Sequence, residues 1–155
     1  MILPEPWAPS GPANDEIWYT SSNGNIVTPY KTSSLPTIVS NTYENGNGVI
    51  KFATDVTSIG YNAFKGRTSL TSVTFGNSLD TIRNYVFENC TGLTSMTIPN
   101  SATSIGEGAF ISCRNLTSIT YTGTITQWNN ITKGSYWHKN VPATVVHCTD
   151  GDAPI

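Results

Sequence analysis

The sequence of 155 residues contains little charge. Asp, Glu, Lys and Arg make up 12% of it, about half the usual share. Thr, Ser and Asn take their place, so the surface is expected to carry mainly hydroxyl and amide groups. The net charge is −2, and Lys and Arg form no cluster. Because nucleic-acid binding depends on basic side chains that displace counterions from phosphates, a nucleic-acid partner is excluded.

The sequence also lacks long apolar runs. No stretch approaches the roughly 20 apolar residues that span a bilayer, which excludes insertion into a membrane. The first residues, MILPEPWAPSGPANDE, contain prolines and acids where a secretory signal has a basic start and an apolar core. Two explanations stay open: the protein is not exported by that route, or Met1 is not its natural start.

What the sequence does contain is a repeat. Residues 57–75 read TSIGYNAFKGRTSLTSVTF, residues 80–98 read DTIRNYVFENCTGLTSMTI and residues 103–121 read TSIGEGAFISCRNLTSITY. Apolar residues recur in register every 23 residues: Ile59, Ile82 and Ile105; Phe64, Phe87 and Phe110; Leu70, Leu93 and Leu116; Val73, Met96 and Ile119; Phe75, Ile98 and Tyr121. Such a period is typical of a leucine-rich-type solenoid. One unit cannot close a core alone, but stacked units bury a continuous one.

Each unit combines a strand with a return segment. Residues 70–75 alternate between apolar and hydroxyl side chains, which predicts a half-buried β-strand. Residues 59–64 are predicted to form a turn or a short helix, and the Gly, Asn, Ser and Thr between them suit turns. The outward strand positions, about 5 Å apart from one unit to the next, are Ser72, Thr74, Ser95, Thr97, Ser118 and Thr120. Two interpretations stay open: a binding surface for a protein chain or a sugar, or ordinary solvent-facing strand residues.

Both ends of the array are predicted to be capped. The Asn23-Gly24 pair predicts a β-hairpin between residues 16–20 and 25–28. Residues 49–52 are interpreted as the strand of an incomplete first repeat. After the last repeat, Ile125, Trp128 and Ile131 predict a short helix, and residues 143–148 predict a closing strand. The predicted division is therefore a proline-rich extended arm (1–14), an N-terminal β-hairpin cap (15–48), the repeats (49–121) and a C-terminal cap and tail (122–155).

The pattern SIG-x-x-AF-x-x-C-x-x-L-T-S-[VI]-T-[IFY] resembles the BspA-like leucine-rich repeats of bacterial surface proteins, abundant in Bacteroides-type organisms and their phages. The resemblance is strongest over residues 49–121. The segments IWYTSSNGNIVTPY and WNNITKGSYWHKNVPATVVHCTDGD resemble those that often flank such arrays. Two departures leave the core positions intact: Arg67 stands where the other copies have Cys90 and Cys113, and Arg83 replaces the glycine of its neighbours.

This resemblance implies a right-handed leucine-rich repeat solenoid, mainly β with short helical or irregular turns. It also implies a role in adhesion or protein recognition without catalysis. It does not identify the partner, because such repeats bind many different ones.

The residues that could carry chemistry are few. Cys90 and Cys113 take equivalent places in consecutive units, so they are either free buried thiols or a disulfide. The one cluster of ligand-type residues is His147, Cys148, Asp150 and Asp152. Neighbouring strand residues point to opposite faces, and the set falls short of a zinc or calcium site, so we interpret it as part of the cap. No catalytic residue, metal site or cofactor is predicted.

The four tryptophans are divided between the two ends of the chain. Trp18, Trp128 and Trp137 are expected to pack in the core or the caps. Trp7 lies among the prolines of the arm and is the candidate for anchoring the protein to another chain.

Two functions remain. The first is a recognition or adhesion module at a bacterial surface that presents the Ser/Thr-rich face to a protein or glycan partner. The second is an accessory protein of a bacteriophage virion, a capsid decoration or fibre, anchored through the arm. The resemblance favours the first function and an extracellular or cell-surface location. The missing secretory signal favours the virion, provided that Met1 is the natural start.

Overall fold

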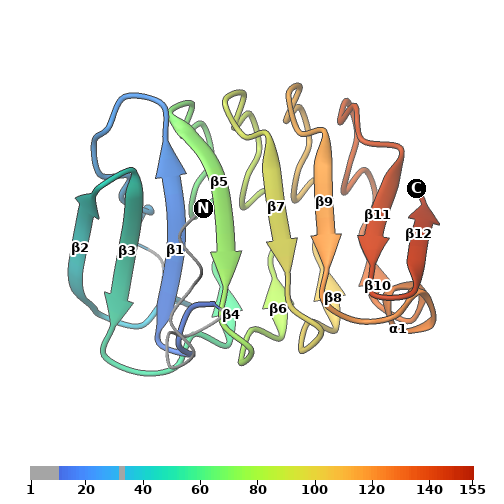
Figure 1. Ribbon diagram of the computed structural model, residues 1–155, viewed down its shortest axis with the longest axis horizontal. Coiled ribbons are helices and arrows are strands. Elements are labelled where there is room, and N and C mark those ends of the chain that lie inside the picture. Colours follow the sequence, from blue (N-terminus) through green and yellow to red (C-terminus); the bar gives the residue numbers. More distant parts are fainter. Residues whose placement is uncertain (1–10, 32–33) are drawn as a thin grey trace, which may run out of the picture.

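The computed structural model describes residues 11–31 and 34–155, and it is a solenoid of about four turns wound between two β-sheets (Figure 1). The larger sheet, sheet A, consists of β1 (Glu16–Ser21), β2 (Ile38–Glu44), β3 (Asn47–Phe52), β5 (Leu70–Phe75), β7 (Ser95–Ile98), β9 (Ser118–Tyr121), β11 (Val145–Cys148) and β12 (Gly151–Pro154). Sheet B consists of β4 (Ser58–Ile59), β6 (Thr81–Ile82), β8 (Ser104–Ile105) and β10 (Thr132–Lys133). The helix α1 (Ile125–Asn129) precedes β10.

Each turn contributes one short strand to sheet B and one longer strand to sheet A. The pairs β4–β5, β6–β7, β8–β9 and β10–β11 form the four turns, and the strands contributed to one sheet are parallel. Ile59, Ile82 and Ile105 lie opposite one another across sheet B. The 23-residue period thus places equivalent residues side by side, which confirms the predicted solenoid.

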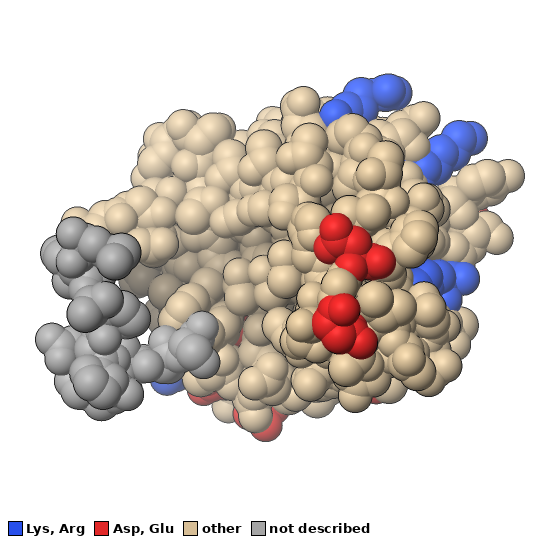
Figure 2. Space-filling model, turned by 45° about the vertical axis from the view of Figure 1, so that its right-hand side comes forward, with Lys and Arg blue, Asp and Glu red and all other residues tan. Residues whose placement is uncertain are grey.

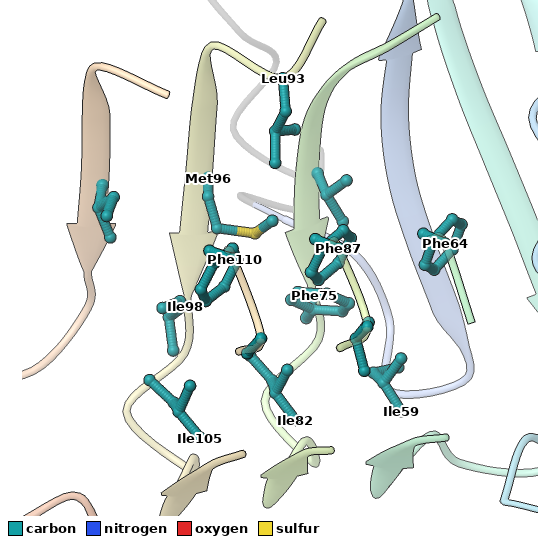
Figure 3. Close-up of a cluster of buried hydrophobic side chains, with 14 of the residues drawn as sticks. Ile59, Phe64, Phe75, Ile82, Phe87, Leu93, Met96, Ile98, Ile105 and Phe110 are labelled. Carbon is teal, nitrogen blue, oxygen red and sulfur yellow. The ribbon is translucent and has the colours of Figure 1, made fainter. Parts of the chain in front are cut away.

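The core is a set of parallel rows of apolar side chains between the sheets (Figure 3). Phe64, Phe87 and Phe110 are fully buried and stack face to face, with ring centroids 5.4 Å apart and planes within 5° of parallel. In Figure 3 the isoleucine row of sheet B runs below this phenylalanine row. Since each side chain meets its own counterpart in the next turn, one packing solution serves the whole array.

The segment from sheet B to sheet A is a run of tight turns, not a helix. Every turn of the solenoid has two left-handed residues in equivalent positions, with φ between 57° and 69°: Asn62 and Gly66, Tyr85 and Asn89, Gly108 and Ser112, Tyr136 and Asn140. Left-handed residues cannot continue a right-handed helix. Of the two predicted alternatives, the turn is therefore confirmed and the short helix was wrong.

The N-terminal end differs from the prediction. The expected pairing of residues 16–20 with 25–28 was wrong, because β1 pairs with β3 on one side and β5 on the other, both antiparallel. The hairpin in this region joins β2 to β3 through Asn45 and Gly46, which both have positive φ. Residues 49–52 do form a strand, but β1 separates it from the repeat strands. Alternating strand residues fit either direction of pairing, so the pattern does not fix the neighbour.

The structure of the N-terminal end explains why Arg67 stands where the other repeats have Cys90 and Cys113. Cys90 and Cys113 each donate a thiol hydrogen bond of 3.0 Å to a carbonyl of the preceding turn, from Phe64 and Phe87 respectively. The turn that contains Arg67 has residues 25–31 beside it instead. Arg67 Nε donates to the Thr28 carbonyl at 2.9 Å, and its guanidinium lies 3.9 Å from the centroid of the Tyr30 ring. A long cationic side chain therefore joins the first turn to this segment.

The C-terminal end closes the core with tryptophan. Trp137 packs edge-on against Phe110, the last ring of the phenylalanine row, and Trp128 of α1 packs against both Trp137 and Tyr121. Both tryptophans are buried, as predicted. The predicted closing strand is confirmed as β11, and β12 is an additional antiparallel strand at the edge of sheet A. The part of the chain that the structure describes has no helix with the length and apolar character needed to cross a bilayer.

Candidate binding face

The outward side of sheet A carries the predicted hydroxyl groups. In β5, β7 and β9 the inward side chains, such as Val73 and Met96, are buried, whereas the alternate hydroxyl-bearing side chains are half-buried. The strand pairing aligns them in two rows, Ser72–Ser95–Ser118 and Thr74–Thr97–Thr120. The structure therefore brings all six predicted residues together on one face.

Both rows continue into strands outside the repeats. Thr20 of β1 lies opposite Ser72, with their hydroxyl oxygens 2.6 Å apart. Trp18 lies opposite Thr74, and at the other end of the same row His147 lies opposite Thr120. This row therefore runs from an indole ring across three threonines to an imidazole. The repeat pattern predicts the three threonines but not the two ends of the row, because Trp18 and His147 lie outside the repeated units.

Trp18 was expected to pack in the core or a cap, but it lies on the outward side of sheet A. Its neighbours in sequence, Ile17 and Tyr19, are buried in the core, so Trp18 points to the opposite, outward side and is only half-buried. A hollow beside its ring is lined by Asn47, Gly48 and Val49. Large aromatic side chains on a surface are common anchors for partners, since they offer area at a low entropic cost. Trp7 lies outside the described residues.

Several hydroxyls of the two rows are available for a partner. In the described part of the chain, no side-chain hydrogen bond engages the hydroxyls of Thr74, Ser95, Thr97, Ser118 and Thr120. A hollow of about 550 Å³ adjoins the threonine row and is lined by Gly11, Pro12, Thr74, Phe75, Asn77, Thr97, Pro99, Asn100 and Thr122. One face of the molecule, shown in Figure 2, is largely uncharged, with a few acidic side chains close together and basic ones toward an edge.

A second hydroxyl row, which the sequence analysis did not identify, crosses sheet B. It consists of Ser58, Thr81, Ser104 and Thr132, aligned by the parallel pairing of the short strands. Here several hydroxyls are already bonded: Arg83 Nε donates to Ser58 Oγ at 3.1 Å, and Ser104 Oγ donates to Thr81 Oγ1 at 3.3 Å. Because internal bonds occupy these groups, this row is the weaker candidate.

The cluster at the C-terminal end is built into the cap. His147 Nδ1 and Asp152 Oδ1 are 2.7 Å apart, a contact that orients the imidazole at the end of the threonine row. Asp150 Oδ1 accepts a 2.8 Å hydrogen bond from the Ile125 amide at the start of α1. Cys148 is half-buried, whereas His147 is exposed on the neighbouring position. Residues 11–31 and 34–155 contain no group of His, Cys, Asp and Glu side chains placed to hold a metal ion.

The cysteines at the repeated position are buried thiols. Burial raises the pKa of Cys90 to about 12 and also raises the pKa of Cys113. A thiol with a raised pKa holds little thiolate at neutral pH and is a poor nucleophile. Of the two alternatives for Cys90 and Cys113, the structure has free thiols.

Comparison with known proteins identifies a repeat family. A sequence profile described as "BspA type Leucine rich repeat region (6 copies)" matches residues 15–137. The match extends beyond residues 49–121 into both predicted caps. Searches of curated proteins and of solved structures each found no significant match.

Proposed function

Because the chain belongs to the BspA-type leucine-rich repeat family, we propose that it is a non-enzymatic recognition module that binds a protein or glycan partner on the outward face of sheet A. Leucine-rich repeat domains generally mediate protein binding, and this repeat family is typically non-enzymatic. Beyond that general role, we propose which face binds the partner, which residues form this face, and that the partner is either a protein or a glycan.

The observation that carries this proposal is the alignment of threonine hydroxyls without side-chain hydrogen bonds between an indole ring and an imidazole. Trp18, Thr74, Thr97, Thr120 and His147 form one continuous row over five neighbouring strands. Strands lie about 4.8 Å apart, so the row presents hydrogen-bonding groups at a constant interval along the solenoid. A constant interval suits an extended partner that repeats along its own length. The indole ring adds apolar area at one end of the row.

We propose that this face acts at a bacterial surface, as the family suggests. The alternative is a virion accessory protein that docks through the N-terminal arm. In that case the arm would begin at Asn14, whose carbonyl accepts a 2.8 Å hydrogen bond from the Val56 amide and a 3.2 Å bond from Ser78 Oγ. These two bonds hold Asn14 against the solenoid.

The test is a binding experiment with the full chain on protein and glycan microarrays. We expect Thr97→Arg to weaken binding at least tenfold, because a guanidinium in the middle of the row blocks its neighbours on both sides. The matched control is Thr132→Arg, which places the same group on an exposed threonine of sheet B. Equal binding by the wild type and Thr97→Arg would exclude the outward face of sheet A as the binding site.

The bacterial-surface function and the virion function differ in the role of the N-terminal arm. Removal of residues 1–10 leaves binding to a cell-surface partner intact if the face acts alone. If the protein is a virion component, the same truncation abolishes cosedimentation with purified phage particles. The single substitution Trp7→Ala tests the same difference without shortening the chain.

A further inference from the structure

The two ends of sheet A are built differently. Sheet A begins at β2 and ends at β12, and within residues 11–31 and 34–155 no further strand pairs with the outer edge of either. Such an edge exposes backbone N–H and C=O groups that can pair with another chain. Monomeric proteins usually protect these edges, so an edge without protection indicates a partner strand.

The edge at β12 is protected. This strand has four residues, Gly151–Pro154, and includes both Asp152 and Pro154. Proline has no N–H to donate to a neighbouring strand, and a charged residue on a short strand opposes further pairing. Another strand therefore adds poorly at this end.

The edge at β2 is open. This strand has seven residues, IVSNTYE, with no proline, and its one charged residue, Glu44, is the last residue of the strand. Its one irregularity is a register shift between Ile38 and Ser40, which leaves residues 40–44 in regular pairing with β3. Val39 exposes 62% of its surface and Ile26 exposes 53%. Ile26 belongs to the same end of the molecule, because the neighbouring Val27 carbonyl accepts a 3.0 Å hydrogen bond from Asn41 Nδ2 of β2.

We propose that two copies of the chain form a dimer in which β2 of one copy pairs with β2 of the other in the antiparallel direction. A two-fold interface uses the same edge twice and leaves only the two protected β12 edges at the ends of the joined sheet. One open and one protected edge are what a closed dimer requires. Two open edges would allow a filament, and two protected edges would favour a monomer.

Other occupants of the β2 edge fit less well. A head-to-tail assembly would pair β2 with β12 of the next copy, where Pro154 removes a donor. The N-terminal arm carries Pro4, Pro6, Pro9 and Pro12, and this density of proline interrupts the ladder of hydrogen bonds that a strand needs. The edge of a second copy has neither defect.

The dimer has a consequence for binding. In an antiparallel strand pair the two-fold axis is perpendicular to the sheet, so the outward faces of both copies point to the same side. A partner with repeated epitopes would meet both faces at once, which raises the apparent affinity through effective concentration. This consequence, unlike the dimer itself, rests on the proposed binding face.

The test measures the mass of the full chain in solution by sedimentation velocity over a range of micromolar concentrations. The wild type is expected to sediment as a dimer, and Thr42→Lys as a monomer. Thr42 lies one residue from the centre of β2 and is exposed, so two lysines meet near the two-fold axis and repel each other. Thr42→Val keeps the strand propensity without charge, and it is expected to remain a dimer.

Circular dichroism separates loss of the dimer from loss of the fold. If Thr42→Lys keeps the β spectrum of the wild type and has half its mass, the β2 interface is supported. A monomeric wild type at high micromolar concentration would overturn the inference, as would a dimer that Thr42→Lys leaves unchanged.

Discussion

At the scale of single residues, backbone conformation limits which side chains each turn accepts. Each turn needs two residues with φ near +60°, a region that costs most L-residues roughly 1–2 kcal/mol. Asparagine and glycine occupy five of these eight positions, as expected. Tyr85, Ser112 and Tyr136 do not follow that preference. Tyr85 gains something in return, because its hydroxyl donates a 2.8 Å hydrogen bond to Glu107 Oε1 of the next turn.

Ser112 has little such compensation, which leads to a stability prediction. Its hydroxyl makes one long contact of 3.4 Å with Asn140 Nδ2, and the first turn has Gly66 at the equivalent position. Ser112→Gly is therefore expected to raise the free energy of unfolding by about 1 kcal/mol, because glycine adopts this conformation without strain. Urea denaturation measures the change.

The matched control for this prediction is Ser95→Gly. Ser95 lies in β7, where glycine gains no conformational advantage and adds flexibility to the unfolded chain. This substitution is expected to destabilise by roughly 0.5–1 kcal/mol. A Ser112→Gly protein that is less stable than the wild type would contradict the argument from strain.

The buried thiols allow a second prediction at this scale. Burial raises the pKa of Cys90 to about 12 and raises the pKa of Cys113, and both side chains are fully buried. With Ellman's reagent at pH 8, the native protein is expected to react only at the half-buried Cys148. All three cysteines should react after denaturation in urea. Fewer than three thiols in the denatured, unreduced protein would indicate a disulfide.

At the scale of elements, the sequence predicts repeated structure well and local exceptions poorly. The strands β5, β7 and β9 follow from alternation, and their pairing follows from the period, because equivalent residues stack. The direction of β1 does not follow, since Ile17 and Tyr19 would face the core in either direction. The strands of sheet B are too short, at two residues each, for alternation to reveal. The proposed binding face was predictable only where it repeats, so the sequence pattern did not include Trp18 and His147 in it.

His138, in the C-terminal cap, is expected to make the folded protein less stable in acid. His138 Nδ1 is buried without a hydrogen-bond partner among the described residues, and the ring packs on Trp137. Burial lowers the pKa of His138 from its ordinary value of 6.5. The folded state therefore resists protonation of this ring more than the unfolded state does. The resulting stability is present above about pH 6.5 and declines as the pH falls through that value.

We expect the free energy of unfolding to decrease between pH 7.5 and pH 5, and His138→Gln to reduce this decrease. Urea denaturation of both proteins at the two pH values is the measurement. Carboxylates contribute to the pH dependence of both proteins equally, so the difference between the two slopes isolates His138. Identical slopes would show that its protonation is not linked to folding.

At the scale of the whole molecule, stability should grow with the number of turns. Each turn contacts only the turns before and after it, so an added turn brings one more internal contact surface. Insertion of a second copy of residues 80–102 directly after Ala102 is expected to give a folded protein. Its urea m-value should rise, since more surface is exposed on unfolding, and its length should increase by about 4.8 Å. Denaturation curves and small-angle X-ray scattering test both expectations.

A scrambled version of the same insert serves as the control for this experiment. It adds equal length without the recurring apolar positions, so it should form a loop and leave the m-value nearly unchanged. If the duplicated and scrambled inserts behaved alike, stacking of equivalent side chains would not be the source of the fold's stability.

The stacked turns also bear on how such a protein can evolve. A duplication of one whole period adds one threonine and one serine to the outward rows while both caps keep their neighbours. The length of the proposed binding face can therefore change in fixed increments when one whole repeat is gained or lost. Under the proposed function, the number of repeats sets the length of partner that the face can contact, while the architecture stays the same.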